Sequence, residues 1–233
     1  MICGALLASG RGLRAGGDLP KQFQTLAGEP LLVHSLRTLC AIDDFDGLLV
    51  AMAPDQMELG RELLAPWLAQ ESRLQLVAGG ATRQETVLAL VKAALQRDPD
   101  AWLVTHDAAR PFVSPQLLQA HINALADHQV VDTIVPLRDS LATCADGVTV
   151  TAMPSRSSTW AVQTPQSFHA AAYLNCWQSL SPESQAAQTD ACGVFLACDV
   201  PVHALMGEVT NIKITEPLDF LYAEVLYREL PRD

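Results

Sequence analysis

Basic residues and glycines are concentrated directly behind the first apolar run, in the stretch LASGRGLRAGGDLPKQF from residue 7 to 23. Backbone N–H groups of a glycine-rich loop can face phosphate oxygens, and the side chains of Arg14 and Lys21 can neutralise those oxygens. The stretch therefore indicates a loop that binds a phosphate-bearing ligand. A basic surface loop without a ligand is the alternative interpretation of these residues alone.

Two familiar phosphate-binding motifs fit this stretch poorly. Gly10, Gly12 and Ala15 satisfy the dinucleotide-binding pattern GxGxxG/A. That pattern leads straight into a helix, whereas two Gly and one Pro within 16–20 would break a helix there. A Walker A loop fails as well, since Asp18 stands where that motif has Lys. What fits better is a long loop that stays extended up to its lysine.

A second polar segment, THDAARPF at 105–112, follows a predicted strand. A carboxylate at the end of such a strand can hold Mg²⁺ against phosphate groups, which makes Asp107 a candidate metal ligand. Arg110 beside it can serve a second anionic group. Taken alone, an Asp at this position is more often a helix cap or a turn residue.

A third polar segment, TNIKITEP at 210–217, has the alternation of a strand. The alternation places Asn211, Lys213 and Thr215 on one face and two isoleucines on the other. Lys213 is then either a further cation of the same site or a residue that keeps an edge strand from pairing with another chain.

The elements that must position these segments alternate along the first half of the chain. Apolar runs predict strands at 2–8, 48–53, 74–77 and 102–105, and amphipathic stretches predict helices at 31–41, 55–70, 82–97 and 114–128. Such alternation predicts an α/β fold with a mostly parallel sheet and helices on both faces. The polar segments would then meet at the carboxyl edge of the sheet, where such folds bind ligands.

The rhythm changes after residue 130. Short β-like pieces at 130–136, 140–143 and 148–152 surround an Asp-Gly turn at 145–147 and predict an inserted hairpin. Because a hairpin at 137–160 has little core of its own, we expect it to pack on another chain in a homodimer. Helices at 169–179, 190–197 and 217–228 and strands at 200–206 and 211–215 complete one domain, 1–233.

Composition narrows the classes of function. The net charge of −11 argues against a nucleic-acid partner, which would need a basic face. No apolar run approaches the roughly 20 residues of a membrane span, and the start does not look like a signal peptide. We therefore expect a cytoplasmic protein. Eight of the fifteen Lys and Arg lie in polar segments: Arg11, Arg14, Lys21, Arg83, Arg110, Arg138, Arg156 and Lys213. Such clustering in an acidic protein suits a small polyanion. The six scattered Cys suggest neither a zinc site nor a disulfide framework.

Several motifs together resemble one family over nearly the whole chain. LASGRGLRAGGDLPKQF, GGATRQETV, THDAARPF, SRSSTWAVQTPQSF, TDAC and NIKITEPLDF are similar to the cytidylyltransferases that make CDP-linked polyols. The resemblance implies a Rossmann-like nucleotidyltransferase fold and a homodimer joined by a protruding arm. It also implies Mg²⁺-dependent transfer of CMP from CTP to a polyol phosphate, with release of pyrophosphate.

The resemblance also assigns roles to individual residues. Arg14, Lys21 and Lys213 match catalytic cations that bind the triphosphate or stabilise the transition state. The nucleotide-binding positions are Ala8, Ser9, Gly10, Gly12, Gly79, Gly80, Ala81 and Thr86. The polyol phosphate pocket corresponds to Asp107, which is also the metal ligand, and to Arg110, Ser140, Arg156, Thr189 and Thr215, with Ser140 and Arg156 reaching over from the partner subunit.

Departures from the family pattern are few and remove no charge. Ser9 stands where the family usually has Ala or Gly, and Ala15 stands where Met is common. Thr86 stands where Ser is usual. The acceptor phosphate is already largely ionised at neutral pH, so the reaction needs no general base, and we interpret His106 as structural. LSPESQAAQTDACGVF and VDTIV resemble the branch that uses ribitol 5-phosphate, and Trp160 points to the methylerythritol 4-phosphate branch. A sugar-1-phosphate nucleotidylyltransferase is a further alternative.

Overall fold

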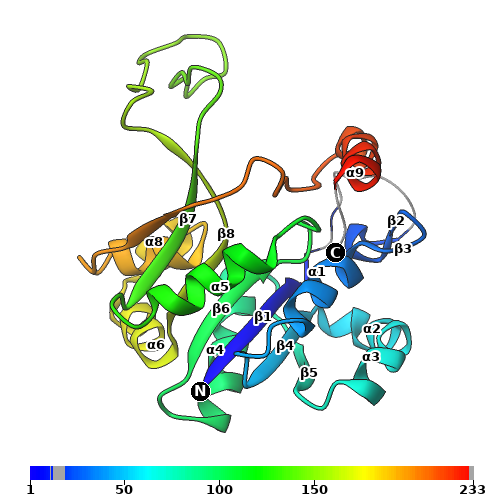
Figure 1. Ribbon diagram of the computed structural model, residues 1–233. Helices are drawn as coiled ribbons and strands as arrows, with labels where there is room; N and C mark the ends of the chain where they lie inside the picture. The colour runs from blue at the N-terminus through cyan, green and yellow to red at the C-terminus, as the bar shows by residue number, and fades with distance from the viewer. Residues whose placement is uncertain (11, 13–18, 231–233) are drawn as a thin grey trace.

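The computed structural model describes residues 1–10, 12 and 19–230 of the chain. Within these ranges, seven strands form one sheet in the order β5-β4-β1-β6-β8-β7-β9 (Figure 1). Their bounds are Ile2–Ala8 (β1), Gly47–Met52 (β4), Leu74–Ala78 (β5), Trp102–Asp107 (β6), Val130–Pro136 (β7), Trp160–His169 (β8) and His203–Met206 (β9). β8 runs antiparallel between β6 and β7, and the other neighbouring pairs are parallel. The prediction of a mostly parallel, Rossmann-like sheet is therefore confirmed.

Helices cover both faces of this sheet. The described helices are α1 (Leu31–Cys40), α2 (Met57–Leu63), α3 (Ala65–Gln70), α4 (Arg83–Arg97), α5 (Pro115–Ala124), α6 (Ala170–Ser179), α7 (Pro182–Ala187), α8 (Ala191–Leu196) and α9 (Pro217–Glu229). Two 3-10 turns, η2 (Lys21–Phe23) and η3 (Pro54–Gln56), and a hairpin of β2 (Thr25–Leu26) and β3 (Glu29–Pro30) complete the regular elements. None of the helices described combines the length and the apolar character that crossing a bilayer requires.

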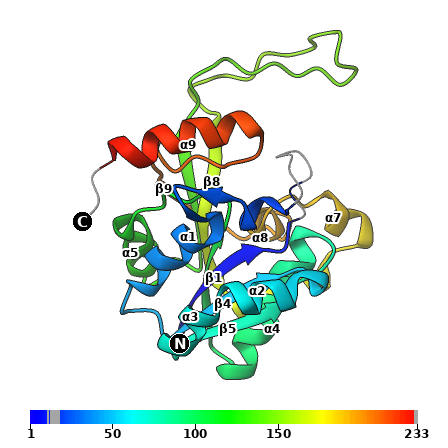
Figure 2. The same ribbon diagram turned by 90° about the vertical axis from the view of Figure 1, so that its right-hand side faces the viewer.

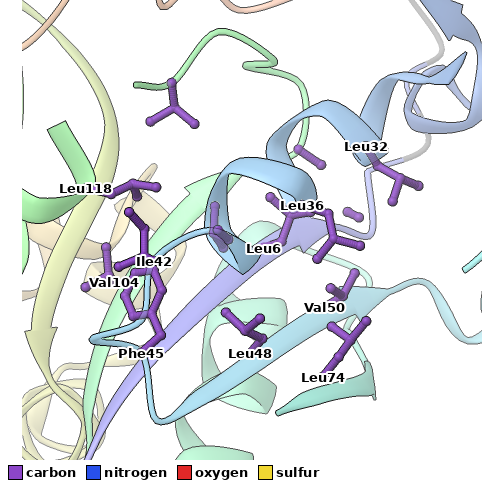
Figure 3. Close-up of a cluster of buried hydrophobic side chains, with 14 of the residues drawn as sticks. Leu6, Leu32, Leu36, Ile42, Phe45, Leu48, Val50, Leu74, Val104 and Leu118 are labelled. Carbon is purple, nitrogen blue, oxygen red and sulfur yellow. The ribbon is translucent and has the colours of Figure 1, made fainter. Parts of the chain in front are cut away.

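Alternate side chains of the central strands feed two separate cores. Leu6 of β1 and Val50 of β4 lie in the cluster that includes Leu36 of α1 (Figure 3). Ala5 and Leu49, one position earlier on the same strands, lie in the cluster formed with α4, α6 and α8. Strand side chains alternate between faces, and burial on both faces gives the continuous apolar runs that the sequence shows.

Local signals explain where two helices begin. Thr82 caps α4 and forms a capping box with Glu85, in which each residue satisfies a backbone N–H of the other. Ser114 caps α5, and Pro115 occupies its first turn, where a missing N–H does no harm. Both starts agree with the sequence, although α5 ends at residue 124 rather than 128.

The predicted helix at 55–70 is wrong as a single element. It consists of η3, α2 and α3, and the break falls at Leu64, whose backbone angles of −93° and 6° are not helical. Pro66 follows in the first turn of α3. Because proline has no N–H to donate to a preceding turn, the helix restarts there.

The strand predicted at 211–215 does not form. Ile214 donates its backbone N–H to the carbonyl of Ala109 at 2.8 Å, so the segment is attached to the loop after β6 rather than to a strand. Asn211 is fully buried whereas Lys213 is exposed, so the two do not share a face as the predicted alternation placed them. β9 is also shorter than the predicted 200–206.

β8 and α7 are regular elements that sequence analysis did not predict. β8 contains Gln163, Pro165 and Gln166, so it lacks an apolar alternation, yet it fills the space between β6 and β7. α7 has only six residues, and its signal is the Ser181 cap followed by Pro182.

The segment 137–159, which we call the arm, joins β7 to β8 and extends away from the sheet in both views (Figures 1 and 2). The predicted turn is present, with Gly147 at a φ of 72° and Asp146 accepting from the backbone of Val148 and Thr149. The predicted strands 140–143 and 148–152 are reduced to one bridge between Thr143 and Ala152.

Candidate active site

A cleft of about 660 Å³ opens at the carboxyl ends of β1, β4 and β6. Its described lining comprises residues 7–10, 21–22, 53–55, 80–83, 107–109 and 213. Eight predicted site residues are among them: Ala8, Ser9, Gly10, Lys21, Gly80, Ala81, Asp107 and Lys213. The three polar segments of the sequence therefore meet at one place, as the topology of a parallel sheet requires.

The predicted nucleotide-binding segment at 79–86 is tied to the glycine-rich loop through the buried hydroxyl of Thr86. This hydroxyl donates to the carbonyl of Thr82 at 2.9 Å, so it accepts from the Ser9 hydroxyl at 2.6 Å and from the Gly80 N–H at 3.2 Å. A Cβ on Gly79 would lie 3.0 Å from both Ser9 and Thr86. Thr86 and Gly79 therefore shape the wall of the cleft from behind.

The start of α4 occupies other backbone groups of the same wall. The Glu85 carboxylate accepts the N–H of Ala81 at 2.6 Å and that of Thr82 at 3.1 Å. A Cβ on Gly80 would lie 2.1 Å from the Cβ of Glu85, so this turn requires glycine. Ala81 thus contributes the wall of the cleft, while its N–H is already engaged.

Lys21 is held by residues on both sides of it. Gly12 has a φ of 61°, and a Cβ there would approach the Lys21 side chain to 2.7 Å, so glycine leaves room for the lysine. The neighbouring Gln22 is buried and donates to the Ala8 carbonyl at 2.9 Å. Nζ of Lys21 donates to the carbonyl of Ile214 at 2.7 Å, which ties Lys21 to the segment that carries Lys213.

Asp107 ends β6 and pairs with two cations. Its Oδ2 lies 2.7 Å from Nζ of Lys213, and its Oδ1 lies 3.4 Å from Nη2 of Arg83. Burial alone would raise the pKa of this carboxyl, but the charges of Arg83 and then Lys213 hold the pKa well below its ordinary value. Asp107 is therefore ionised at neutral pH.

The backbone around Asp107 is fixed by a buried histidine. His106 donates from Nε2 to the carbonyl of Arg110 at 2.9 Å and accepts at Nδ1 from the Thr164 hydroxyl at 3.0 Å. Burial lowers the pKa of His106 to about 4, so the ring is neutral. Thr164 in turn accepts the N–H of Asp107 at 3.1 Å. These contacts agree with the structural role that we expected for His106.

Lys213 reaches the cleft because its segment is docked on the loop after β6. Nη1 of Arg110 donates to the carbonyl of Asn211 at 2.8 Å, next to the bond between Ile214 and Ala109. Ile214 is buried in a small cluster with Leu26. Burial lowers the pKa of the Arg110 guanidinium, and this arginine is nine-tenths buried beside the cleft rather than in its lining.

The other predicted residues lie apart from this cleft in the single chain. Ser140 and Arg156 are exposed on the arm, where Nε of Arg156 donates to the carbonyl of Leu137 at 3.1 Å. Thr189 is exposed before α8, and Thr215 lies beyond Lys213 at the start of α9. Arg14 falls outside the described residues.

Residues that the sequence did not assign also belong to the site. Arg83 and Gln22 line the cleft, and Gln166 of β8 accepts from Nη2 of Arg83 at 3.3 Å. Arg83 was predicted only as one of the clustered basic residues. Its place in GGATRQETV, directly after the Thr82 cap, is the signal that could have identified it.

The Mg²⁺ that the resemblance implies would have one protein ligand in this cleft, the carboxylate of Asp107. Asp107 presents an ionised carboxylate to the cleft, and no group of three or more metal-binding side chains occurs in the described part of the chain. Mg²⁺ is commonly held by one or two carboxylates together with substrate phosphates and water. The donor set therefore fits an Mg²⁺ that the nucleotide brings with it.

A cleft of this size at the carboxyl edge of a mostly parallel sheet, lined by glycines, two lysines and an ionised aspartate, is typical of nucleotide-binding α/β proteins. Residues 2–229 match the model of the IspD family, described as 2-C-methyl-D-erythritol 4-phosphate cytidylyltransferase. The chain belongs to this family of cytidylyltransferases, and it is a nucleotidyltransferase.

Individual relatives agree with this assignment. A ribitol-5-phosphate cytidylyltransferase of Lactiplantibacillus plantarum is 34% identical over 97% of this chain and 98% of the relative. The crystal structure of a 4-diphosphocytidyl-2C-methyl-D-erythritol synthase from Anaerococcus prevotii superposes with a TM-score of 0.82, at 26% identity over 98% of this chain and 96% of that one. The corresponding cytidylyltransferase of Thermus thermophilus gives 0.71 at 28% identity, over 96% of this chain and 98% of that one.

Proposed function

We propose that this protein transfers CMP from CTP to a polyol phosphate, with D-ribitol 5-phosphate as the acceptor, and releases pyrophosphate and CDP-ribitol. The observation that carries the chemistry is that Lys21, Lys213 and Asp107 all line the same cleft, with Lys213 paired to Asp107. The choice of ribitol is supported by the relative from Lactiplantibacillus plantarum and by the TDAC and VDTIV segments.

In this reaction an oxygen of the acceptor phosphate attacks the α-phosphorus of CTP. One P–O bond forms, and the bond from the α-phosphorus to the bridging oxygen breaks as pyrophosphate leaves. The attacking oxygen is already ionised at neutral pH, so no side chain has to remove a proton. Lys21 and Lys213 are placed to stabilise the charge that gathers on the α-phosphoryl oxygens. Mg²⁺ held by Asp107 would neutralise the phosphates when it is bound.

Exchange of either lysine tests this chemistry. Lys21→Ala and Lys213→Ala should fold normally and lose about 100-fold or more in pyrophosphate release, by analogy with the removal of one oxyanion-hole donor. Arg61→Ala, at an exposed position on α2, is the matched control and should keep full activity. Near-normal turnover in both lysine variants would overturn the assignment.

The acceptor is decided by a direct comparison. Pyrophosphate release with CTP and Mg²⁺ should be faster with ribitol 5-phosphate than with 2-C-methyl-D-erythritol 4-phosphate, the acceptor that the family description names. A faster rate with 2-C-methyl-D-erythritol 4-phosphate would identify that compound as the acceptor and contradict the choice of ribitol 5-phosphate. Comparable rates with UTP or GTP would favour the sugar-1-phosphate nucleotidylyltransferase alternative.

We also propose a homodimer whose arms complete each other's sites. Val148, Val150 and Met153 are apolar side chains exposed on the arm, which is unusual for a segment that stays in water. Arg156 of the arm would bind the acceptor phosphate of the partner subunit. A mixture of inactive Arg156→Ala and Lys213→Ala proteins should therefore recover activity after exchange of subunits, since one of the two sites in a mixed dimer is intact. If the activity of the mixture does not exceed the sum of the activities of the two separate variants, the sites are not shared between subunits.

A one-domain organisation, with the dimerisation arm at 137–160, and a cytoplasmic location stay predictions of the sequence.

A further inference from the structure

Arg83, the first residue of α4, spans the carboxyl edge of the sheet to reach two strands. Its Nη2 lies 3.4 Å from Oδ1 of Asp107 on β6 and 3.3 Å from Oε1 of Gln166 on β8. The backbone of Arg83 is fixed by the capping box of Thr82 and Glu85. The guanidinium is therefore held from its helix at one end and from the sheet at the other.

The side-chain amide of Gln166 is oriented by its other neighbours. Its Nε2 donates to Oδ1 of Asp132 on β7 at 3.0 Å, and its Oε1 accepts the N–H of Ala191 at the start of α8 at 3.3 Å. Gln166 is completely buried. Because the amide nitrogen is committed to Asp132, the amide oxygen has to face Arg83.

A second guanidinium nitrogen, Nη1 of Arg83, is buried without a hydrogen-bond partner. Leaving a buried donor unsatisfied costs stability, and native proteins contain few such groups. The arrangement favours a role for the charge of Arg83 beside Asp107.

Lys213 has two tasks that compete for its charge. In the free protein its ammonium group pairs with Oδ2 of Asp107 at 2.7 Å. To act on the α-phosphate it has to turn toward the nucleotide, which would leave Arg83 as the protein cation paired with Asp107, beside any Mg²⁺ that the nucleotide brings. Only 11% of the Asp107 side chain is exposed, so this carboxylate depends on nearby cations to remain ionised.

We propose that Arg83 is a positioning residue for CMP transfer: it stays on Asp107 as the standing counter-ion, so that Lys213 can turn to the phosphoryl group. This inference rests on the proposed function. Without Arg83, Lys213 would remain paired with Asp107, and the step that needs its charge would slow. Binding of CTP through the glycine-rich loop would not depend on this change.

The test compares Arg83→Gln with Arg83→Lys in the full-length protein. Arg83→Gln should lower kcat by about 10- to 100-fold, the range expected for losing one hydrogen bond to a charged group, with the KM for CTP close to that of the wild type. Arg83→Lys keeps the charge and should recover part of the loss. Arg61→Gln on α2 is the matched control, and thermal unfolding shows whether each variant is folded.

A double-mutant cycle with Asp107→Asn separates positioning from a general loss of structure. Once the carboxylate is neutral, Arg83→Gln should lower kcat much less than it does in the wild type, because both changes remove the same interaction. If the effects of Arg83→Gln and Asp107→Asn on kcat are fully additive in energy, or if Arg83→Gln has the kcat of the wild type, the positioning role of Arg83 is wrong. The proposed function would still stand in that case. A wild-type protein that releases no pyrophosphate with either acceptor would instead overturn the proposed function, and this role with it.

Discussion

The hydroxyl of Thr86 offers a sharp test of how the wall of the cleft around Gly79 and Gly80 is built, and of the proposal that this wall binds the nucleotide. Thr86→Val keeps the shape of the side chain but removes the acceptor for the Ser9 hydroxyl and the Gly80 N–H. It also removes the donor to the Thr82 carbonyl. Thr86→Ser keeps the hydroxyl and removes only a methyl group that is completely buried.

The two substitutions should differ in their effects on stability and on the KM for CTP. In Thr86→Val two donors lose their acceptor, and because Ser9 and Gly80 are only partly buried each loss lies at the low end of the range for unsatisfied groups. The total is about 2 kcal/mol of stability. The glycine-rich loop also loses its link to α4, which we expect to raise the KM for CTP by ~2- to 10-fold, the equivalent of one net hydrogen bond. Thr86→Ser should cost ~1 kcal/mol, as other buried methyl deletions do, and leave KM unchanged.

Two assays on the same preparations decide the matter. Thermal unfolding reports stability, and a loss of 2 kcal/mol should lower the melting temperature by about 4–8 °C in a chain of this size. Initial rates of pyrophosphate release against CTP concentration report KM. If Thr86→Val and Thr86→Ser share the same KM, the hydroxyl does not couple the loop to nucleotide binding and the reasoning is wrong.

Three further substitutions probe neighbouring features. Gly10→Ala meets no atom within 4 Å, so it should unfold like the wild type yet raise the KM for CTP, and an unchanged KM would exclude close approach of the nucleotide there. Gly12→Ala should lower both stability, by ~1–2 kcal/mol, and kcat, because φ is positive and the methyl displaces Lys21; a wild-type kcat would contradict this. Burial raises the pKa of Asp132 from 3.8 to about 6, because the folded protein disfavours the ionised carboxylate. The free energy of unfolding is therefore highest below pH ~3.8, where Asp132 is protonated in both states, and it falls as the pH rises through 6. Asp132→Asn should therefore be more stable than the wild type at pH 8, by up to about 3 kcal/mol, and a melting-temperature gain that does not shrink toward pH 4 would refute the sign.

Local patterns in the sequence determined several elements correctly. β1 is a run of apolar residues buried on both faces, and α4 and α5 begin at Thr82 and Ser114. These features depend on the residue's own conformational preferences and on neighbours within one turn or strand, which the sequence displays directly. Interactions of that range need no knowledge of the rest of the fold.

Elements that depend on distant partners were predicted less well. β8 has a proline and two glutamines and is a strand because β6 and β7 pair with its two edges. The segment 211–215 alternates like a strand, yet it is attached to Ala109 and is not one. Pairing partners over such separations outweigh local propensity, which spans only ~1 kcal/mol for a strand residue.

The candidate site divides in the same way. The sequence by itself determined which side chains carry the charge, because Lys21, Asp107 and Lys213 stand in recognisable polar segments. Tertiary structure decided that Lys213 pairs with a carboxylate 106 residues away, and that Arg83 and Gln166 join them. An ion pair is a property of distance and burial, and both are set only when the sheet brings the ends of its strands together.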